Sequence, residues 1–391
     1  MQKFYVNIYK ATVLLLVLAI YGCSTRYEPA QTTELDGDGW IAKDSFYEKT
    51  VHFGTTRPDK CQKYLGHAEG QGRLADYTEC AKDPLRLNTG NSESAQVIKY
   101  GRAKVKIPYI KKVGGTSGMS LSSLDYDIGW EKFISELTER DLLIFIHGFN
   151  TSFSNAAIRC AQLAHDTNFN GEAIFYSWPS KENPATYSKD KDRARENFVF
   201  FANFLQDIAG KTDKKIHIVA HSMGTYILMN SLAILDDRMS KDDHILSFRR
   251  SRNNGKIFAQ IILAAPDIAK DDYYQSFSKH NFQNMAENIT LYSAANDHVL
   301  DSSQIVNYFI EGTAQARLGD SSKEFFVIDG MDTVDTRQEI SHQFFGHSFY
   351  ANYRSLVSDM HLSLRYGAPP NSRMLQEVID KKGNHLWFIR D

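Results

Sequence analysis

The chain has 391 residues, of which 42% are hydrophobic and 24% are charged, a composition typical of a globular protein with a sizeable core. Its formal net charge is -2 at pH 7, so the overall charge gives no basis for binding nucleic acid or an anionic membrane. The sequence has no CxxC, HExxH or phosphate-loop motif, and we therefore expect neither a metal nor a cofactor.

The N-terminus predicts export from the cytoplasm. Lys3 and Lys10 precede an apolar run over residues 11–20, which is shorter than the ~20 residues that a membrane span needs. The run ends just before Cys23, as in a bacterial lipoprotein signal. We expect residues 1–22 to be a signal peptide and Cys23 to carry the lipid, palmitate included.

The residues after the cysteine predict where the protein resides. Residues 23–45 are mostly polar and read as a flexible tether between the lipid and a single domain over residues 46–391. Ser24, rather than aspartate, follows the cysteine, which resembles lipoproteins of the outer membrane that face the periplasm. Two alternatives stay open, namely ordinary signal cleavage elsewhere and an uncleaved short anchor.

The other cysteines fit an exported protein. Cys61 and Cys80 lie close together in a loop that contains glycine and aspartate, and an oxidising compartment favours their pairing as a disulfide. Cys160 lies in an apolar helical stretch, where we expect it to be a small buried hydrophobic residue.

The predicted elements follow one another as strands and then as alternating strands and helices. Continuous apolar or alternating runs predict the strands, and helical periodicity predicts the helices. A charged insertion over 180–195 separates a strand from the next helix. In chain order we expect strands at 50–58, 95–108 and 142–146, a helix through 156–164, a strand at 173–179, a helix at 196–209, a strand at 216–220, a helix at 226–235, and strands at 257–267, 288–297 and 324–329.

This alternation predicts a mainly parallel central sheet with helices on both faces. Functional groups in such a sheet gather at the carboxyl ends of its strands. His147 and Ser222 come just after a predicted strand, and Asp267 and Asp297 are the last residues of theirs. We therefore expect these four residues to lie along one edge of the sheet.

Ser222 is the predicted nucleophile. It stands between the apolar strand at 216–220 and a Leu- and Ala-rich helix, which is the strand–turn–helix arrangement of a nucleophile elbow. The turn would place the Ser222 hydroxyl at a helix N-terminus, where backbone N–H groups can face a reacting oxyanion. The usual motif is G-x-S-x-G, and here Ala220 replaces the first glycine while Gly224 keeps the last.

A serine nucleophile needs a base and a carboxylate that orients the base. In this arrangement the chain order is serine, acid, histidine, and His347, in a small-residue turn past the last predicted strand, is the preferred base. His342 is the alternative base. For the acid we prefer Asp297, and Asp267 is the alternative acid or else a cap for a helix beginning near Ala269.

The oxyanion hole should use two backbone N–H groups. Met223 follows the nucleophile and supplies one of them, and Phe149 in the loop after the strand at 142–146 supplies the other. Gly148 allows this loop to approach the substrate. His147 is expected to be a hydrogen-bonding structural residue rather than a base.

Several motifs together resemble a bacterial family of α/β-hydrolase-fold proteins of uncharacterised function. The resemblance covers roughly residues 50–355 and implies the α/β-hydrolase fold and a serine hydrolase site, but no particular substrate. It also implies that Tyr187 and Asp190 belong to a segment near the site. The motifs that carry it are FGTTR at 53–57, YGR at 100–102, IHGFN at 146–150, YSWPS at 176–180, AHSMG at 220–224, APD at 265–267, ND at 296–297 and GHS at 346–348.

The sequence thus predicts a membrane-tethered serine hydrolase that acts on a small-molecule or lipid ester, a thioester or an amide. Two alternatives remain, a non-catalytic envelope lipoprotein that uses the fold as an interaction surface and a lipid acyltransferase. The acyltransferase would share the triad and differ only in the acceptor, which residue patterns do not identify.

Overall fold

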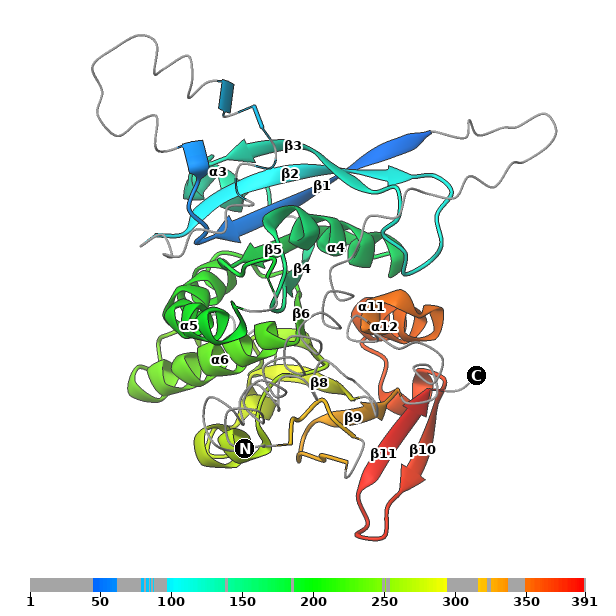
Figure 1. The fold of residues 1–391 in the computed structure, drawn as a ribbon. Helices are drawn as coiled ribbons and strands as arrows, with labels where there is room; N and C mark the ends of the chain where they lie inside the picture. The colour runs from blue at the N-terminus through cyan, green and yellow to red at the C-terminus, as the bar shows by residue number, and fades with distance from the viewer. Residues whose placement is uncertain are drawn as a thin grey trace, which may run out of the picture.

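The computed structural model describes residues 45–61, 79–80, 82–83, 85, 87, 97–137, 140–183, 186–247, 250, 254–293, 316–321, 325–336 and 349–389. Their strands form one 11-stranded sheet that runs through the whole molecule (Figure 1). In spatial order its strands are β10 (Leu375–Ile379), β11 (His385–Ile389), β9 (Asp332–Asp335), β8 (Ala286–Ser293), β7 (Phe258–Ala264), β6 (Ile216–His221), β4 (Asp141–Ile146), β5 (Gly171–Ser177), β1 (Phe46–Thr55), β2 (Lys99–Pro108) and β3 (Ser120–Tyr126).

Most of the sheet is parallel, as the alternation of strands and helices predicts. The strands from β1 through β5, β4, β6, β7, β8 and β9 to β11 run parallel to their neighbours. The antiparallel pairings of the described strands are at the two ends of the sheet, β1 with β2, β2 with β3, and β10 with β11. The carboxyl ends of the central strands therefore lie at one edge, where β4, β5 and β6 end next to one another.

Helices cover both faces of the sheet and enclose two apolar cores. The helices α3 (Trp130–Ser135), α5 (Tyr187–Ala209) and α6 (Met223–Lys241) pack on one face. On the other face lie α4 (Phe153–Asp166), α11 (Phe349–Asn352) and α12 (Arg354–Tyr366). Side chains of β4 alternate between the cores, with Ile144 in the first and Phe145 in the second, because successive strand residues point to opposite faces.

Two of the predicted elements differ from the structure, the start of the helix α5 and the strand at 324–329. α5 begins at Tyr187 rather than at Glu196, so the helix includes much of the charged insertion that we placed before it. The predicted strand at 324–329 is not a strand where the structure describes it, and the strand in this part of the sheet is β9, which pairs with β8. β9 is short and polar in sequence, and it owes its position to pairing with β8 and β11 rather than to an apolar pattern.

Short elements connect β7 to β8. They are α8 (Lys270–Asp272), the π-helix η4 (Tyr273–Phe277) and the 3-10 helix η5 (Phe282–Asn284). Tyr273, Phe277 and Phe282 belong to the core beneath α6. These connections therefore close the end of the core on the α5–α6 face.

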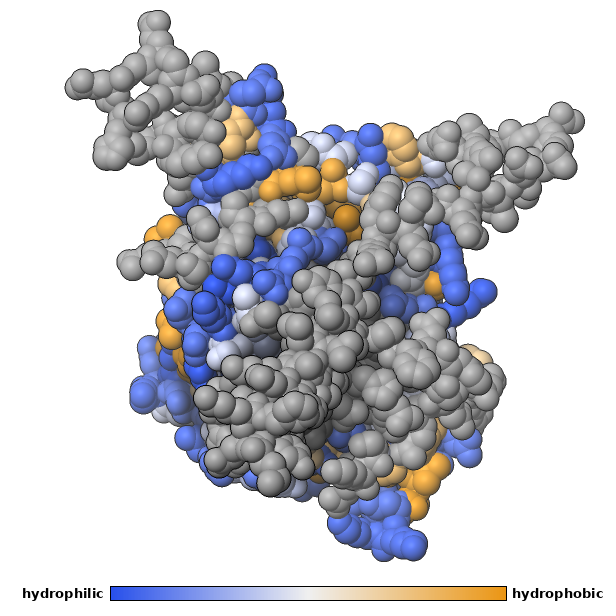
Figure 2. Space-filling view, viewed as in Figure 1, coloured by the Kyte–Doolittle hydropathy of each residue, from blue (hydrophilic) through white to orange (hydrophobic). Residues whose placement is uncertain are grey.

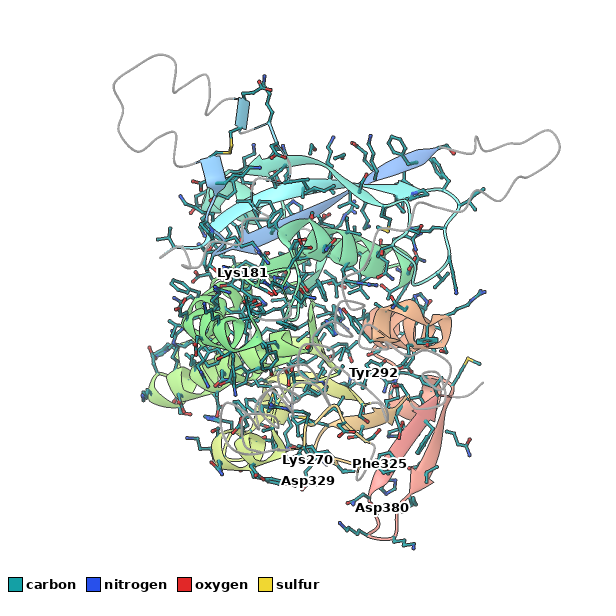
Figure 3. The ribbon with its side chains drawn as sticks, viewed as in Figure 1. Lys181, Lys270, Tyr292, Phe325, Asp329 and Asp380 are labelled. Carbon is teal, nitrogen blue, oxygen red and sulfur yellow. A yellow bond between two sulfur atoms is a disulfide. The ribbon has the colours of Figure 1, made fainter. Side chains whose placement is uncertain are left out.

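The N-terminal strands extend the sheet at one end. A Cys61–Cys80 disulfide joins the segment after β1 to a helical residue further along the chain, as the sequence predicts, and Figure 3 shows it as a bond between two sulfur atoms. Cys160 is a buried free cysteine in α4, also as predicted.

Within the described part of the chain, no helix combines the length and the apolar character that a membrane span requires.

The C-terminal hairpin of β10 and β11 was not predicted. It follows the 3-10 helix η6 (Pro370–Ser372) and joins the sheet through β9. Asp380, labelled at its tip in Figure 3, accepts hydrogen bonds from the backbone N–H groups of Lys382 and Asn384. Figure 2 shows apolar side chains at this hairpin, where Val378 and Ile379 of β10 are exposed.

Candidate active site

Ser222 occupies a strained turn between β6 and α6. Its φ of 52° and ψ of -124° lie outside the regions that L-residues favour, and such a residue costs about 1–3 kcal/mol unless its surroundings enforce it. Its N–H donates to the Ala264 carbonyl at 3.0 Å, and its carbonyl accepts the Thr225 hydroxyl at 2.6 Å. The end of β7 and the first turn of α6 therefore fix the elbow that the sequence predicts.

Two glycines bring the elbow close to the end of β4. A Cβ atom at Gly148 would lie 2.8 Å from Ser222 Cβ, and one at Gly224 would lie 2.6 Å from the His147 carbonyl oxygen. Any side chain at either position would force the two segments apart. The loop after β4 and the N-terminus of α6 thus touch at Ser222, and only 3% of the Ser222 surface is exposed.

The predicted oxyanion donors flank this contact. Met223 is the first residue of α6, so its N–H is one of those that have no acceptor within the helix. Phe149 follows Gly148 directly, and its ring packs edge-on against Tyr187 with the ring centroids 5.3 Å apart. Both donors therefore belong to segments that adjoin Ser222.

Arg57 is the residue at this edge whose role sequence reasoning did not identify. It lies just after β1, it is 1% exposed, and its guanidinium reaches the loops after β4 and β5. It donates to Ser177 Oγ at 2.7 Å, to the Ser180 carbonyl at 2.9 Å and to the Thr151 carbonyl at 2.6 Å. Its motif, FGTTR, belongs to the family resemblance, but a buried arginine leaves no periodic signal in a sequence that would indicate its role.

His147 is buried beside Arg57. Its Nδ1 lies 2.8 Å from the Gly148 carbonyl oxygen, and its Nε2 lies 3.4 Å from Ser177 Oγ. Its ring stacks on Trp178, whose indole N–H donates to the His147 carbonyl at 2.9 Å. Burial, together with the positive charge of Arg57, lowers the pKa of His147 to about 3, so the imidazole is neutral at physiological pH.

Asp267 has partners other than a helix N-terminus. The cap of α8 is Ala269 rather than Asp267, so the predicted capping role is wrong. Asp267 Oδ2 accepts the Tyr187 hydroxyl at 2.7 Å, and Oδ1 lies 3.3 Å from Arg317 Nε. The carboxylate thereby joins the loop after β7 to the start of α5. The backbone N–H of Asp267 donates to the Ser222 carbonyl at 3.4 Å, so the same loop also contacts the elbow.

Tyr187 and Asp190, which the resemblance implied to be near the site, lie in the first turn of α5. Asp190 accepts from Ser180 Oγ at 2.9 Å and pairs with Arg193 at 2.5 Å. Burial raises the pKa of Asp190, and these hydrogen bonds oppose the shift. This network replaces solvent for the charged residues and explains why a helix can begin inside a charged insertion.

The remaining predicted site residues lie outside the described residues. They are the acid Asp297, the base His347, its alternative His342 and the lipidation site Cys23. The structure therefore brings together Ser222, Met223, Gly148, Phe149, His147 and Asp267 at one edge of the sheet, and the positions of the other four stay predictions.

A cavity of about 670 Å³ lies elsewhere, near the amino ends of β7 and β8. Asp243, Arg250, Lys256 and Asn284 are among the residues that line it. Because Ser222 is at the carboxyl ends of the strands, this cavity is separate from the candidate site.

The sequence matches a protein family described as "Alpha/beta hydrolase of unknown function (DUF900)" over residues 128–364, which is more than half of the chain. A comparison with curated proteins gives no match. Among solved structures, the chain is similar to a putative α/β-superfamily hydrolase from Xanthomonas campestris pv. campestris, with 11% identity, a TM-score of 0.28, and 57% of this chain and 99% of that chain covered.

Two further structures are similar. One is a hyperthermophilic esterase from the archaeon Pyrobaculum calidifontis, with 12% identity, a TM-score of 0.31, and 68% of this chain and 81% of that one covered. The other is an arylesterase, with 12% identity, a TM-score of 0.29, and coverage of 79% and 98% respectively. Likenesses at this level carry no information about the substrate of this chain. The elbow, the parallel sheet and the family match agree, and the protein belongs to the α/β hydrolase family of unknown function.

Proposed function

We propose that the protein is a serine hydrolase that cleaves an ester through an acyl-enzyme on Ser222. The observation that carries the proposal is the strained conformation of Ser222 at the N-terminus of α6, against Gly148. A buried serine at positive φ costs free energy, and the turn has a chemical use because it presents a hydroxyl beside unpaired backbone N–H groups.

In the proposed reaction, Ser222 Oγ attacks the ester carbonyl carbon while His347 takes the hydroxyl proton and Asp297 orients the imidazole. The carbonyl oxygen becomes negative and accepts hydrogen bonds from the N–H groups of Met223 and Phe149. The C–O bond to the alcohol then breaks, and His347 returns the proton to the departing alcohol. Water attacks the acyl-enzyme in the same way, which releases the acid and restores Ser222.

A fluorophosphonate probe tests this proposal, because it reacts only with an activated serine. We expect the full-length protein to be labelled and Ser222→Ala to be unlabelled. Ser231→Ala is the matched control, since Ser231 is a buried serine in the same helix whose hydroxyl bonds only backbone carbonyls, and it should be labelled like the wild type. A folded wild-type protein that resists the probe and cleaves no p-nitrophenyl ester would instead favour a binding role for the fold.

The acyl-chain preference can be measured by hydrolysis of p-nitrophenyl esters. A series of p-nitrophenyl esters from acetate to palmitate would place the substrate among small soluble esters or among lipid esters. Release of p-nitrophenol before acid product accumulates would support the acyl-enzyme. Mass spectrometry of the quenched reaction should show the acyl group on the wild type and not on Ser222→Ala, whereas turnover of the ester by Ser222→Ala at the wild-type rate would support direct attack by water.

We also propose that the protein is lipid-anchored through Cys23 in the cell envelope, with the hydrolase domain in the periplasm. The support is the basic and apolar N-terminal pattern and the disulfide between Cys61 and Cys80, which an oxidising compartment favours. Metabolic labelling with a palmitate analogue should mark the wild type and leave Cys23→Ser unmarked. Equal labelling of both proteins would contradict the proposed site.

A further inference from the structure

Arg57 carries a buried charge that its surroundings do not neutralise by direct pairing. All three of its side-chain hydrogen bonds go to uncharged oxygen atoms, and none of the ion pairs among the described residues involves it. Burial lowers the pKa of Arg57 to about 9, and the more distant Asp190 opposes that shift, so the guanidinium stays charged at neutral pH. A buried charge costs several kcal/mol, which a packed methionine would avoid, so packing alone does not account for an arginine at this position.

The hydrogen bond from Arg57 to Ser177 determines where the protons of Ser177 and His147 lie. A guanidinium can only donate, so Ser177 Oγ accepts from Arg57 Nε at 2.7 Å. The Ser177 hydroxyl proton is then available for His147 Nε2 at 3.4 Å. A neutral histidine that accepts at Nε2 must carry its proton on Nδ1, and Nδ1 donates to the Gly148 carbonyl at 2.8 Å.

The last of these bonds fixes the direction of an N–H group. The peptide between Gly148 and Phe149 is planar, so the Phe149 N–H points opposite to the Gly148 carbonyl. Once His147 holds the carbonyl, the Phe149 N–H cannot turn. This peptide adjoins the nucleophile, because a Cβ atom at Gly148 would lie 2.8 Å from Ser222 Cβ and 3.0 Å from His221 Nδ1.

We propose that Arg57 is a positioning residue for catalysis: through Ser177 and His147 it holds the Gly148–Phe149 peptide so that the Phe149 N–H faces the oxyanion. We call the hydrogen-bonded series of Arg57, Ser177, His147 and Gly148 the Arg57 relay. The inference rests on the proposed hydrolase function and adds to it Arg57, just after β1, and Ser177 of β5, neither of which touches the substrate. The other two bonds of Arg57, to Thr151 and Ser180, hold the loops in which the relay lies.

The test uses Ser177→Ala in the full-length protein, because this change removes the relay hydroxyl and leaves the Thr151 and Ser180 contacts of Arg57 in place. We expect kcat for p-nitrophenyl acetate to fall about 10- to 100-fold while KM changes less than about threefold, since an oxyanion donor acts mainly in the transition state. The rate of fluorophosphonate labelling should fall in parallel, because phosphonylation also places negative charge on an oxygen in this site.

Two variants separate positioning from a general loss of structure. Ser177→Thr keeps the hydroxyl and should restore kcat to within about threefold of the wild type. Ser231→Ala removes a buried hydroxyl of α6 that is outside the relay, and it should leave kcat unchanged even if the melting temperature falls. Equal losses in Ser177→Ala and Ser231→Ala, or a Ser177→Ala enzyme as fast as the wild type, would overturn the inference.

The tautomer of His147 gives a readout on the wild-type protein that does not depend on whether Ser177→Ala folds. With selectively labelled histidine, ¹⁵N NMR at neutral pH should show His147 neutral and protonated at Nδ1, and assignment can use His147→Asn. Protonation at Nε2, or a charged ring, would overturn the relay even if Ser177→Ala were unfolded. A wild-type protein that neither reacts with the probe nor cleaves esters would overturn the hydrolase proposal and this inference with it, whereas a reactive protein with an unaffected Ser177→Ala variant would overturn only the inference.

Discussion

His147 couples the stability of the protein to pH. Its pKa in the folded protein is about 3, because of burial and the nearby Arg57, while that of an unfolded histidine is about 6.5. The unfolded chain therefore binds this proton first as the pH falls. The contribution of His147 to stability is complete above about pH 6.5 and is lost progressively as the pH falls toward 3.

We predict that this residue alone makes the protein about 2 kcal/mol less stable at pH 5 than at pH 7.5. Urea unfolding at the two pH values measures the effect. His147→Asn is the matched variant, because its side-chain N–H₂ can still donate to the Gly148 carbonyl but does not titrate. The variant should lose about 2 kcal/mol less than the wild type over this interval, and equal losses would show that His147 titrates normally.

The two candidate acids can be distinguished by substitution. We predict that Asp297→Asn lowers kcat about 10⁴-fold, the loss expected when the base loses its orienting carboxylate. Asp267→Asn should lower kcat far less and should reduce stability, because Asp267 holds Tyr187 and lies against Arg317. Steady-state kinetics and urea unfolding of both variants provide the measurement, and the reverse ranking would make Asp267 the acid.

At the scale of elements, the contact between the β4 loop and α6 sets the spacing of the site. We predict that Gly148→Ala lowers kcat at least tenfold and stability by about 1–3 kcal/mol, because the added Cβ would lie 2.8 Å from Ser222 Cβ. Gly210→Ala is the control, since Gly210 has a φ of -75° at the end of α5 and its added Cβ would lie 3.3 Å from the Gln206 carbonyl oxygen. A Gly148→Ala enzyme with normal kcat and stability would mean that the loop moves freely against the helix.

The parts of the fold that could be predicted are those with a strong local pattern. The central strands are continuous apolar runs because both of their faces are buried, and the turn at Ser222 has a recognisable motif. The start of α5 could not be predicted in this way, because Asp190 and Arg193 look like solvent-exposed residues until their buried partners are known. The role of Arg57 could not be predicted for the same reason, since its partners lie at the end of β5 and in the loops after β4 and β5, all distant in sequence.

At the scale of the whole molecule, a buried polar cluster attaches the C-terminal hairpin to the rest of the fold. Arg373, just before β10, donates to Thr290 of β8 at 3.0 Å, and its Nε lies 3.5 Å from Asp359 of α12. Tyr292 of β8, labelled in Figure 3, donates to the other oxygen of Asp359. The family match ends at residue 364, so this cluster joins the matched region to the segment that follows it.

Burial raises the pKa of Asp359, and the positive charge of Arg373 opposes that shift. Removing Arg373 therefore takes away the ion-pair partner of a buried carboxyl group, to which the Tyr292 hydroxyl still donates. We predict that Arg373→Met destabilises the protein by about 3–5 kcal/mol, and that Arg373→Met combined with Asp359→Asn costs at least about 1 kcal/mol less than the sum of the two single changes. Urea unfolding of the four proteins measures this coupling.

Arg365→Met is the control for the arginine substitution, because Arg365 is an exposed arginine of the same helix as Asp359, and its loss should change stability by less than about 0.5 kcal/mol. The site should be unaffected in every variant that folds, because β8 and β9 separate the hairpin from β7 and the elbow. Strictly additive losses of stability would show that Arg373 and Asp359 do not interact energetically. Loss of fluorophosphonate labelling in folded Arg373→Met would show instead that the hairpin end of the sheet also positions the loops around Ser222.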